Sequence, residues 1–399
     1  MNIRRRIFAQ LLEELDKKHI TLLCGPRQVG KSYLMKSLMA VLEKRGIKTC
    51  FHDMEQPYSA RKFAQDDAAI FDLLTKQDVV FLDEFYLAKN ISHILKAVHD
   101  SGSKVKIFIS GSSSLQMHTH LKESMAGRFR SIKIYPSVFS EFEQVYGNKT
   151  METMTRFGSL PGLVWEKSEN DKQSLLENIT QTYVAKDIKS FIKEENITAF
   201  NHLIYLLAER QGNLINVVDL ADETRLSAPT IQKYLTLLQE TYALISVPSY
   251  SANMGNELKK SHKYYLYDIG VRNSLLRDFK PLEMRTDKGA LLETFVLHEL
   301  ECNLKPNQEI RFWRTKGEES NEVDFIFIED RQPYPIEVKS QADLNSPPKR
   351  LISFLKKYPT TKNAFIVSSN EKGKTIYRNT SIRWLPFEQA GDIPQLIYQ

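Results

Sequence analysis

The first 135 residues alternate short apolar runs with segments that have the spacing of amphipathic helices. Apolar runs separated by helical patterns are typical of parallel strands that crossover helices bury on both faces. We therefore expect an α/β domain with a parallel sheet and helices on both faces. Its predicted strands are 20–24, 48–52, 79–82 and 106–110.

The rest of the chain changes pattern twice. Helical spacing follows the predicted sheet, and three short helices then precede two strand-like runs, 243–248 and 263–267. A strong helix at 289–304 opens a strand-rich end. The expected domains are an α/β domain at 1–150, a helical lid or linker at 151–197, a winged-helix-like region at 198–267 and a second α/β domain at 268–399.

Composition limits the class of protein. The chain has 399 residues, of which 42% are apolar and 26% charged, so a sizeable core is available. A net charge of +6 is compatible with an anionic partner but does not require one. The three scattered cysteines support neither a disulfide framework nor a zinc cluster. No apolar run approaches the ~18 residues that span a bilayer, so we expect a cytoplasmic protein without membrane contact.

A glycine-rich loop follows the first predicted strand and precedes a helical pattern. Glycines let backbone N–H groups wrap phosphates, the lysine reaches the β and γ oxygens, and the serine hydroxyl binds Mg²⁺. A loop between a strand and a helix N-terminus has the geometry that phosphate binding requires. The loop reads Gly25, Pro26, Arg27, Gln28, Val29, Gly30, Lys31 and Ser32. These residues predict an ATP site.

A second acidic signal belongs to the same site. The apolar run 79–82 ends in Asp83 and Glu84. We expect Asp83 to hold the Mg²⁺ shell and Glu84 to act as the base for the attacking water. The run 106–110 leads into a serine-rich segment in which either Ser112 or Ser113 could sense the γ-phosphate.

Taken together, these pieces resemble the AAA-type ATPases of bacteria and archaea that carry an uncharacterised C-terminal (DUF4143-like) region. The matching segments are 25–32, 81–84, 109–113, 126–128, 135–142 and 158–162. The resemblance implies ATP and Mg²⁺ as cofactors, and it leaves a homo-oligomer open. It also implies that Arg128 contacts the nucleotide of its own or a neighbouring subunit. The alternative is that Arg128 or Arg130 neutralises a helix end.

Two helical segments, 216–221 and 226–235, predict a helix-turn-helix unit within the winged-helix-like region. Its exposed face would carry Thr230, Gln232, Lys233 and Thr236, with Lys259, Lys260 and Lys263 on a wing. Proteins that bind DNA usually gather more Lys and Arg on the reading helix. DNA contact and an interdomain spacer are therefore both open.

Carboxylates and a lysine recur near the C-terminus. Residues i and i+2 of a strand share a face, so Glu337 and Lys339 project together, and Asp324 on a preceding strand can join them. Two carboxylates can bind a divalent metal while the ammonium positions a water. This arrangement resembles the restriction-endonuclease-like superfamily, and the resemblance places the helical metal ligand at Glu293. Glu299 falls within an apolar stripe, where a satisfied core acid is the alternative.

The leading hypothesis is Mg²⁺-dependent ATP binding and hydrolysis coupled to a nuclease-like domain that acts on or binds DNA. The site residues are Lys31, Glu84, Ser112, Arg128 and Lys339 for catalysis, and Ser32, Asp83, Glu293, Asp324 and Glu337 for metal. The alternative is an ATP-switched regulatory or binding protein with an inactive nuclease-like fold, because such folds can persist as binding modules.

Overall fold

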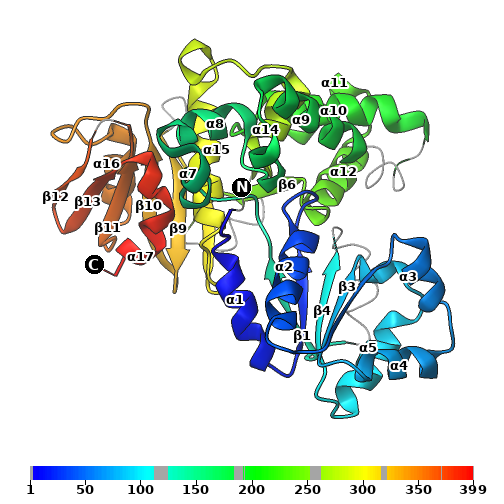
Figure 1. Ribbon diagram of the computed structural model, residues 1–399. Helices are drawn as coiled ribbons and strands as arrows, with labels where there is room; N and C mark the ends of the chain where they lie inside the picture. Colours follow the sequence, from blue (N-terminus) through cyan, green and yellow to red (C-terminus); the bar gives the residue numbers. More distant parts are fainter. Residues whose placement is uncertain are drawn as a thin grey trace.

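The computed structural model describes residues 3–111, 125–183, 192, 194–251, 262–315, 321–369 and 371–398. A parallel sheet and its helices form the N-terminal part at the lower right of Figure 1. Helices of the middle part lie across the top, and a second sheet lies at the left. The N-terminal segment lies between these parts (Figure 1).

The N-terminal sheet has five parallel strands in the order β2-β3-β4-β1-β5. Alternate residues of the strands enter two separate apolar cores: Leu23 and Phe81 face one, and Leu22 and Val80 face the other. The strands are β1 (Ile20–Cys24), β2 (Thr49–Asp53), β3 (Val79–Asp83), β4 (Lys106–Gly111) and β5 (Phe129–Lys133).

Helices cover both faces of this sheet, as the sequence predicts. Leu11 and Leu38 place the first two helices in one core, while Ile70 and Leu95 place two later helices in the other. The first pair is α1 (Ile7–Glu13) and α2 (Lys31–Glu43), and the opposite face carries α4 (Asp67–Thr75) and α5 (Ile91–Asp100), with α3 (Pro57–Lys62) beside β2.

Strand β5 was not among the predicted strands. Its sequence, Phe129–Lys133, buries only Ile132 and exposes Arg130, Ser131 and Lys133. An edge strand with so few apolar residues lacks the hydrophobic run that identifies the four inner strands. Pairing with β1 rather than local hydrophobicity therefore defines it.

The middle part contains its own core of helices and a two-stranded antiparallel sheet. Phe200, Leu220 and Leu235 pack together in that core. Ser227 caps one helix by accepting a hydrogen bond from the Thr230 backbone N–H. The elements are α7 (Phe139–Tyr146), α8 (Thr150–Phe157), η4 (Pro161–Trp165), α9 (Glu169–Tyr183), α10 (Ile197–Glu209), α11 (Val217–Thr224), α12 (Ala228–Glu240), β6 (Leu244–Pro248), β7 (His262–Leu266) and α14 (Ile269–Leu276). Three helices followed by a hairpin, α10 to β7, match the predicted element order.

The C-terminal part is a mixed six-stranded sheet in the order β12-β13-β11-β10-β9-β8. Leu292 and Val296 of α15 pack with Phe365 on one face, and Phe354 of α16 packs with Ile366 on the other. The elements are α15 (Lys288–Glu301), β8 (Gln308–Arg314), β9 (Glu322–Glu329), β10 (Gln332–Val338), α16 (Lys349–Lys357), β11 (Asn363–Val367), β12 (Gly373–Tyr377), β13 (Thr380–Leu385) and α17 (Ile393–Leu396). The expected second α/β domain is thereby present.

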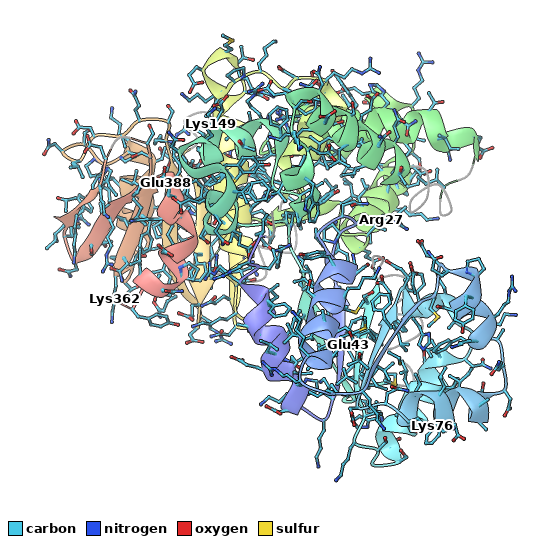
Figure 2. All side chains as sticks on the ribbon, viewed as in Figure 1. Arg27, Glu43, Lys76, Lys149, Lys362 and Glu388 are labelled. Carbon is cyan, nitrogen blue, oxygen red and sulfur yellow. The ribbon has the colours of Figure 1, made fainter. Side chains whose placement is uncertain are left out.

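One apolar core joins the parts. It runs from Leu23 and Leu38 of the N-terminal sheet layer through Phe139 to Phe295 of α15. Exposed lysines are instead spread over the molecule: Lys76, Lys149 and Lys362 point outward from three different parts (Figure 2). Within the described ranges, no helix is long and apolar enough to cross a membrane.

Candidate functional site

The glycine-rich loop connects the end of β1 to the start of α2. Gly25 has a φ of +144°, and a Cβ added there would lie 2.2 Å from the Ile134 carbonyl oxygen. Gly30 has a φ of +89° immediately before α2. Both positions therefore need glycine, the first because of a close backbone approach and the second because of its left-handed conformation.

Lys31 begins α2 and turns back over the loop. Its Nζ donates to the carbonyl oxygens of Gly25 at 2.9 Å and Pro26 at 2.7 Å. The side chain is buried, and burial lowers its pKa. Free backbone N–H groups of the first helical turn lie at the same end of α2. The loop thus presents an ammonium and amide donors, which is the chemistry that holds a phosphate chain.

The two acids at the end of β3 have different surroundings. Asp83 is buried and accepts a hydrogen bond from the Ser110 hydroxyl of the neighbouring strand β4. Glu84 adopts a left-handed backbone with a φ of 48°. Burial raises the pKa of Glu84, although Lys31 opposes the rise. A carboxylate with a raised pKa is a better proton acceptor, which suits a base.

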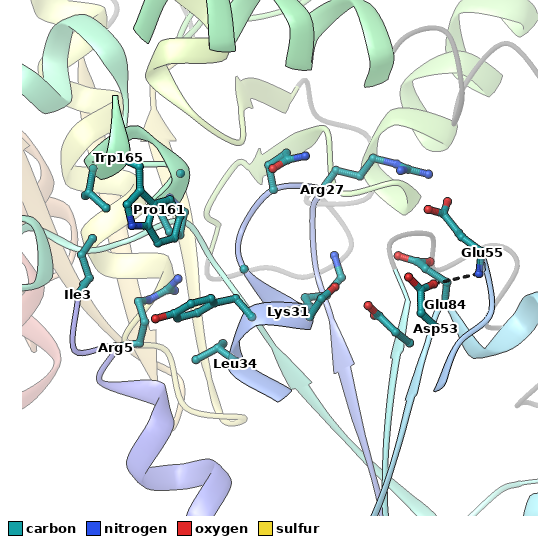
Figure 3. A pocket seen from close by; sticks show the side chains of 17 residues that line it. Ile3, Arg5, Arg27, Lys31, Leu34, Asp53, Glu55, Glu84, Pro161 and Trp165 are labelled. Carbon is teal, nitrogen blue, oxygen red and sulfur yellow. Dashed lines mark hydrogen bonds between the residues drawn. The ribbon is translucent and has the colours of Figure 1, made fainter. Parts of the chain in front are cut away.

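A cavity of about 360 Å³ opens beside the loop (Figure 3). Its two ends differ: one is acidic, the other apolar, and Lys31 lies between them (Figure 3). Lining the acidic end are Asp53, Glu55, Asp83 and Glu84, and lining the apolar end are Ile3, Tyr33, Leu34, Pro161, Val164 and Trp165. Ser32 also lines the cavity. Oxygen ligands from Ser32 and Asp83 fit a magnesium ion.

Sequence reasoning missed part of this lining. Asp53 and Glu55 directly follow a predicted strand, so their position at the sheet's carboxyl edge was a usable signal. The rings of Tyr33 and Trp165 meet edge to face with centroids 5.8 Å apart. Trp165 is 48% exposed, so a large apolar ring is left open to the cavity.

Arg5 was also missed, because no local pattern distinguishes it from its neighbouring arginines. It is buried under the loop and donates to the Val29 carbonyl oxygen at 2.9 Å and the Tyr135 carbonyl oxygen at 2.7 Å. Its Nε lies 2.8 Å from the Glu141 carboxylate. Arg5 also lines the cavity, and its contacts fix the N-terminal segment to the phosphate loop.

Arg128 lies outside the cavity of its own chain. It forms a two-point ion pair with Asp100 at the end of α5, with N–O distances of 2.7 and 3.0 Å. Lys133 of β5 pairs with Cys24, the last residue of β1 before the loop. Arg128 lies five residues earlier on the chain, so its backbone is about 16 Å from that of Lys133. Arg128 thus lies away from the loop of its own chain and pairs with a residue at a helix end, which is the arrangement of the alternative; a contact of Arg128 with a nucleotide stays a prediction. Ser112 and Ser113 lie outside the described residues.

The four residues of the predicted C-terminal site do converge. The Lys339 ammonium lies 2.8 Å from Glu337, and the Val338 backbone N–H donates to Asp324 at 2.8 Å. Burial, and next the negative charge of Asp324, raise the pKa values of both Glu293 and Glu337. Glu299 lies apart from them: it is the satisfied core acid of the alternative and accepts from Phe139 N at 2.6 Å.

Lys263 lies in this acidic site rather than on a wing. It is 2% exposed, and its Nζ lies 2.6 Å from Glu322 and 4.0 Å from Glu293. The expectation that Lys263 reaches DNA is therefore wrong, because the period-2 alternation of β7 turns it inward. Among the described residues no group of three or more His, Cys, Asp or Glu is placed to hold a metal ion. With Lys263 in place, the acidic site does not fit a metal.

The predicted DNA face of α12 is thinly basic. Gln232, Lys233 and Thr236 are exposed, and Thr230 is half-buried. Lys259 and Lys260 lie outside the described residues.

Three segments of the chain match known family models. Residues 17–143 match the family model of an AAA domain, and residues 288–388 match a domain of unknown function (DUF4143). Residues 148–282 match a further domain of unknown function (DUF8612). The resemblance to AAA-type ATPases with a DUF4143 region is thereby confirmed, whereas none of these three matches concerns the nuclease-like superfamily.

Two bacterial relatives are uncharacterized proteins. An uncharacterized protein of Mycobacterium tuberculosis is 25% identical over 339 residues, which cover 84% of this chain and 74% of that protein. An uncharacterized protein of Haemophilus influenzae is 26% identical over 294 residues, covering 67% and 72%. AMPPCP-bound DnaA from Aquifex aeolicus aligns at 13% identity with a TM-score of 0.31, over 58% of this chain and 86% of DnaA.

Proposed function

We propose that this chain, whose first part matches the AAA domain, binds ATP with Mg²⁺ and hydrolyses it in the cavity beside the glycine-rich loop. The proposal depends on one observation: residues of the loop, Lys31, Asp83 and Glu84 all line the same cavity. Loop amides and Lys31 neutralise phosphate oxygens, and Lys31 must first leave the carbonyls of Gly25 and Pro26.

At the acidic end, Ser32 and Asp83 would hold the magnesium ion, which supplies charge stabilisation to the phosphate oxygens. Ser110 keeps Asp83 oriented through its hydroxyl. Glu84, with its raised pKa, accepts the proton of the attacking water. Asp53 and Glu55 add negative charge that favours a cation at this end.

The apolar end suits the base of the nucleotide. Trp165 and Tyr33 offer aromatic surface, and Pro161 lies beside Gly30 at 3.7 Å from a Cβ built on it. A nucleotide whose base stacks there would direct its phosphates toward Lys31, which lies between the two ends (Figure 3). The order of the lining, from the apolar end through Lys31 to the acidic end, thus corresponds to the order base, phosphates and metal.

We further propose that residues 1–150 form the ATPase domain and that its cycle is coupled, through 151–197 and the winged-helix-like region 198–267, to the nuclease-like domain 268–399. The DNA target is supported by the helix-turn-helix order α11–α12 and by the convergence of Glu293, Asp324, Glu337 and Lys339. The second candidate is an ATP-switched binding protein, which the position of the Lys263 ammonium beside Glu322 and Glu293 favours.

Steady-state ATP hydrolysis with Mg²⁺ tests the first proposal. Lys31→Ala should abolish nucleotide binding, and Glu84→Gln should retain binding while lowering kcat roughly 10²- to 10⁴-fold. Lys44→Ala, an exposed lysine just past the other end of α2, is the control and should retain full turnover. Normal turnover in Glu84→Gln would overturn the role of Glu84.

Plasmid DNA incubated with Mg²⁺ or Mn²⁺ separates the two candidate functions. Cleavage lost in Lys339→Ala but kept in Lys31→Ala supports a nuclease. Intact DNA with normal ATP turnover supports the binding protein.

A further inference from the structure

The acidic site of the C-terminal part receives a lysine from the middle part. Lys263 lies on β7, within the residues that match one domain of unknown function, while Glu293 and Glu322 lie within the other. Its ammonium lies 2.6 Å from Glu322 and 4.0 Å from Glu293, and only 2% of the side chain is exposed. Tyr265, two residues along β7, donates to Glu293 at 3.5 Å.

The hairpin that carries Lys263 is held against the C-terminal sheet. Tyr250, just after β6, donates its backbone N–H to the Phe312 carbonyl oxygen of β8 at 2.6 Å. Ser249 forms an isolated parallel β-bridge with Phe312. The Lys263 ammonium lies 5.4 Å from the centre of the Phe312 ring. Lys263 is therefore placed by packing between two parts of the chain rather than by a chance surface contact.

The lysine and a metal ion compete for the same oxygens. Lys263 neutralises Glu293 and Glu322 at one side of the site, and Lys339 neutralises Glu337 at the other. Divalent cations bind carboxylate oxygens at about 2.0–2.6 Å, and the Lys263 ammonium, which is in hydrogen-bond contact with Glu322 and 4.0 Å from Glu293, occupies that space beside Glu322. Glu337 is fully buried, and its Oε1 has no hydrogen-bond partner among the described residues, so an acceptor remains open to a cation.

We propose that Lys263 takes the place of a divalent cation in the acidic site of Glu293, Glu322, Asp324 and Glu337, and that this site accepts a metal only when the charge of the lysine is removed. The inference deepens the proposed function, on which it rests for the role of this site, because a residue of the middle part then decides whether the site takes a metal.

Mn²⁺ binding to the full-length chain without nucleotide, measured by isothermal titration calorimetry, tests the proposal. Lys263→Gln should gain one Mn²⁺ site at least tenfold tighter than any at this position in the wild type. When Asp324→Asn is added to the Lys263→Gln variant, the gained Mn²⁺ site should disappear. When Asp83→Asn is added instead, the gained site should remain. Lys280→Gln removes the same charge from an exposed lysine paired with Asp278 and should gain no site.

A charge-balanced variant covers the case in which Lys263→Gln does not fold. Lys263→Gln with Glu322→Gln removes both members of the close ion pair, so no unpaired charge of that pair is left buried. Glu293, Asp324 and Glu337 remain, and this variant should gain the same Mn²⁺ site.

Two results would overturn the proposal. One is a wild-type Mn²⁺ site that Asp324→Asn removes and that is as tight as the site of Lys263→Gln; the other is folded variants that gain no site. ATP turnover is read separately. If the chain hydrolyses no ATP but its Lys263→Gln variant gains the Mn²⁺ site, the proposed ATPase activity alone is refuted. If the chain hydrolyses ATP but the variant gains no Mn²⁺ site, the role of the lysine alone is refuted.

Discussion

Glu299 is a buried acid at the contact between the N-terminal and C-terminal parts, and its replacement by glutamine gives a signed prediction of stability against pH. The residue is 4% exposed, and its Oε1 accepts from the Phe139 backbone N–H at 2.6 Å. Burial raises the pKa of Glu299 to about 8; the bond from Phe139 and the charge of Arg6 oppose the rise, and Glu141 and Asp392 add to it.

The sign follows from proton binding. Between pH 4.5 and about 8 the folded chain keeps a proton on Glu299 that the unfolded chain releases, so stability falls as pH rises through this window. At about 1.4 kcal/mol for each tenfold change in proton affinity, the upper limit of the cost above pH 8 is about 5 kcal/mol. Glutamine carries no charge at any pH, and its side-chain oxygen can still accept from Phe139.

Glu299→Gln should therefore differ little from the wild type near about pH 5 and be more stable at about pH 8.5. For a chain of this size the gain in Tm is roughly 3–6 °C, measured by differential scanning fluorimetry at both pH values. Glu388→Gln replaces an exposed glutamate of the same part (Figure 2) and should show no such pH-dependent gain. The same Tm difference at both pH values in Glu299→Gln would refute the reasoning.

Three further substitutions test the nucleotide site. Gly25→Ala should abolish ATP binding, since its Cβ would meet the Ile134 carbonyl oxygen at 2.2 Å; Gly46→Ala has a φ of +76° but open space, and calorimetry should show normal binding. Trp165→Ala should weaken ATP roughly tenfold through lost stacking but leave inorganic tripolyphosphate unchanged in the same titration. Arg128→Ala should leave the Kd of ATP unchanged in dilute protein, measured with a fluorescent nucleotide; a tenfold rise would contradict its placement beside Asp100.

Sequence reasoning succeeded where the signal is local. The loop 25–32, the acids after the third predicted strand and the order of strands and helices each depend on neighbours in sequence. The convergence of Glu293, Asp324 and Glu337 followed from a motif whose members lie on adjacent elements. Glu299 was flagged because a carboxylate within an apolar stripe needs a partner, and the structure supplies Phe139 N.

Sequence reasoning failed where remote segments define the role of a residue. Arg5 acts through partners 24 and 130 positions away, which no periodicity of the N-terminal helix reveals. Lys263 was placed on a wing together with Lys259 and Lys260, yet the alternation of β7 and the packing of its hairpin against β8 bury it. Strand β5 lacks an apolar run because it is an edge strand.

The phosphate loop and the C-terminal helix α15 are joined by a short series of buried polar contacts. Arg5 binds the Val29 carbonyl of the loop and the carboxylate of Glu141 in α7. The first residue of α7, Phe139, donates its N–H to Glu299 of α15. Glu293, nearly two turns earlier on α15, lies in the acidic site. A nucleotide that shifts the Val29 carbonyl must therefore break the Arg5 contact or move α7, and α7 cannot move without disturbing the hydrogen bond that fixes α15.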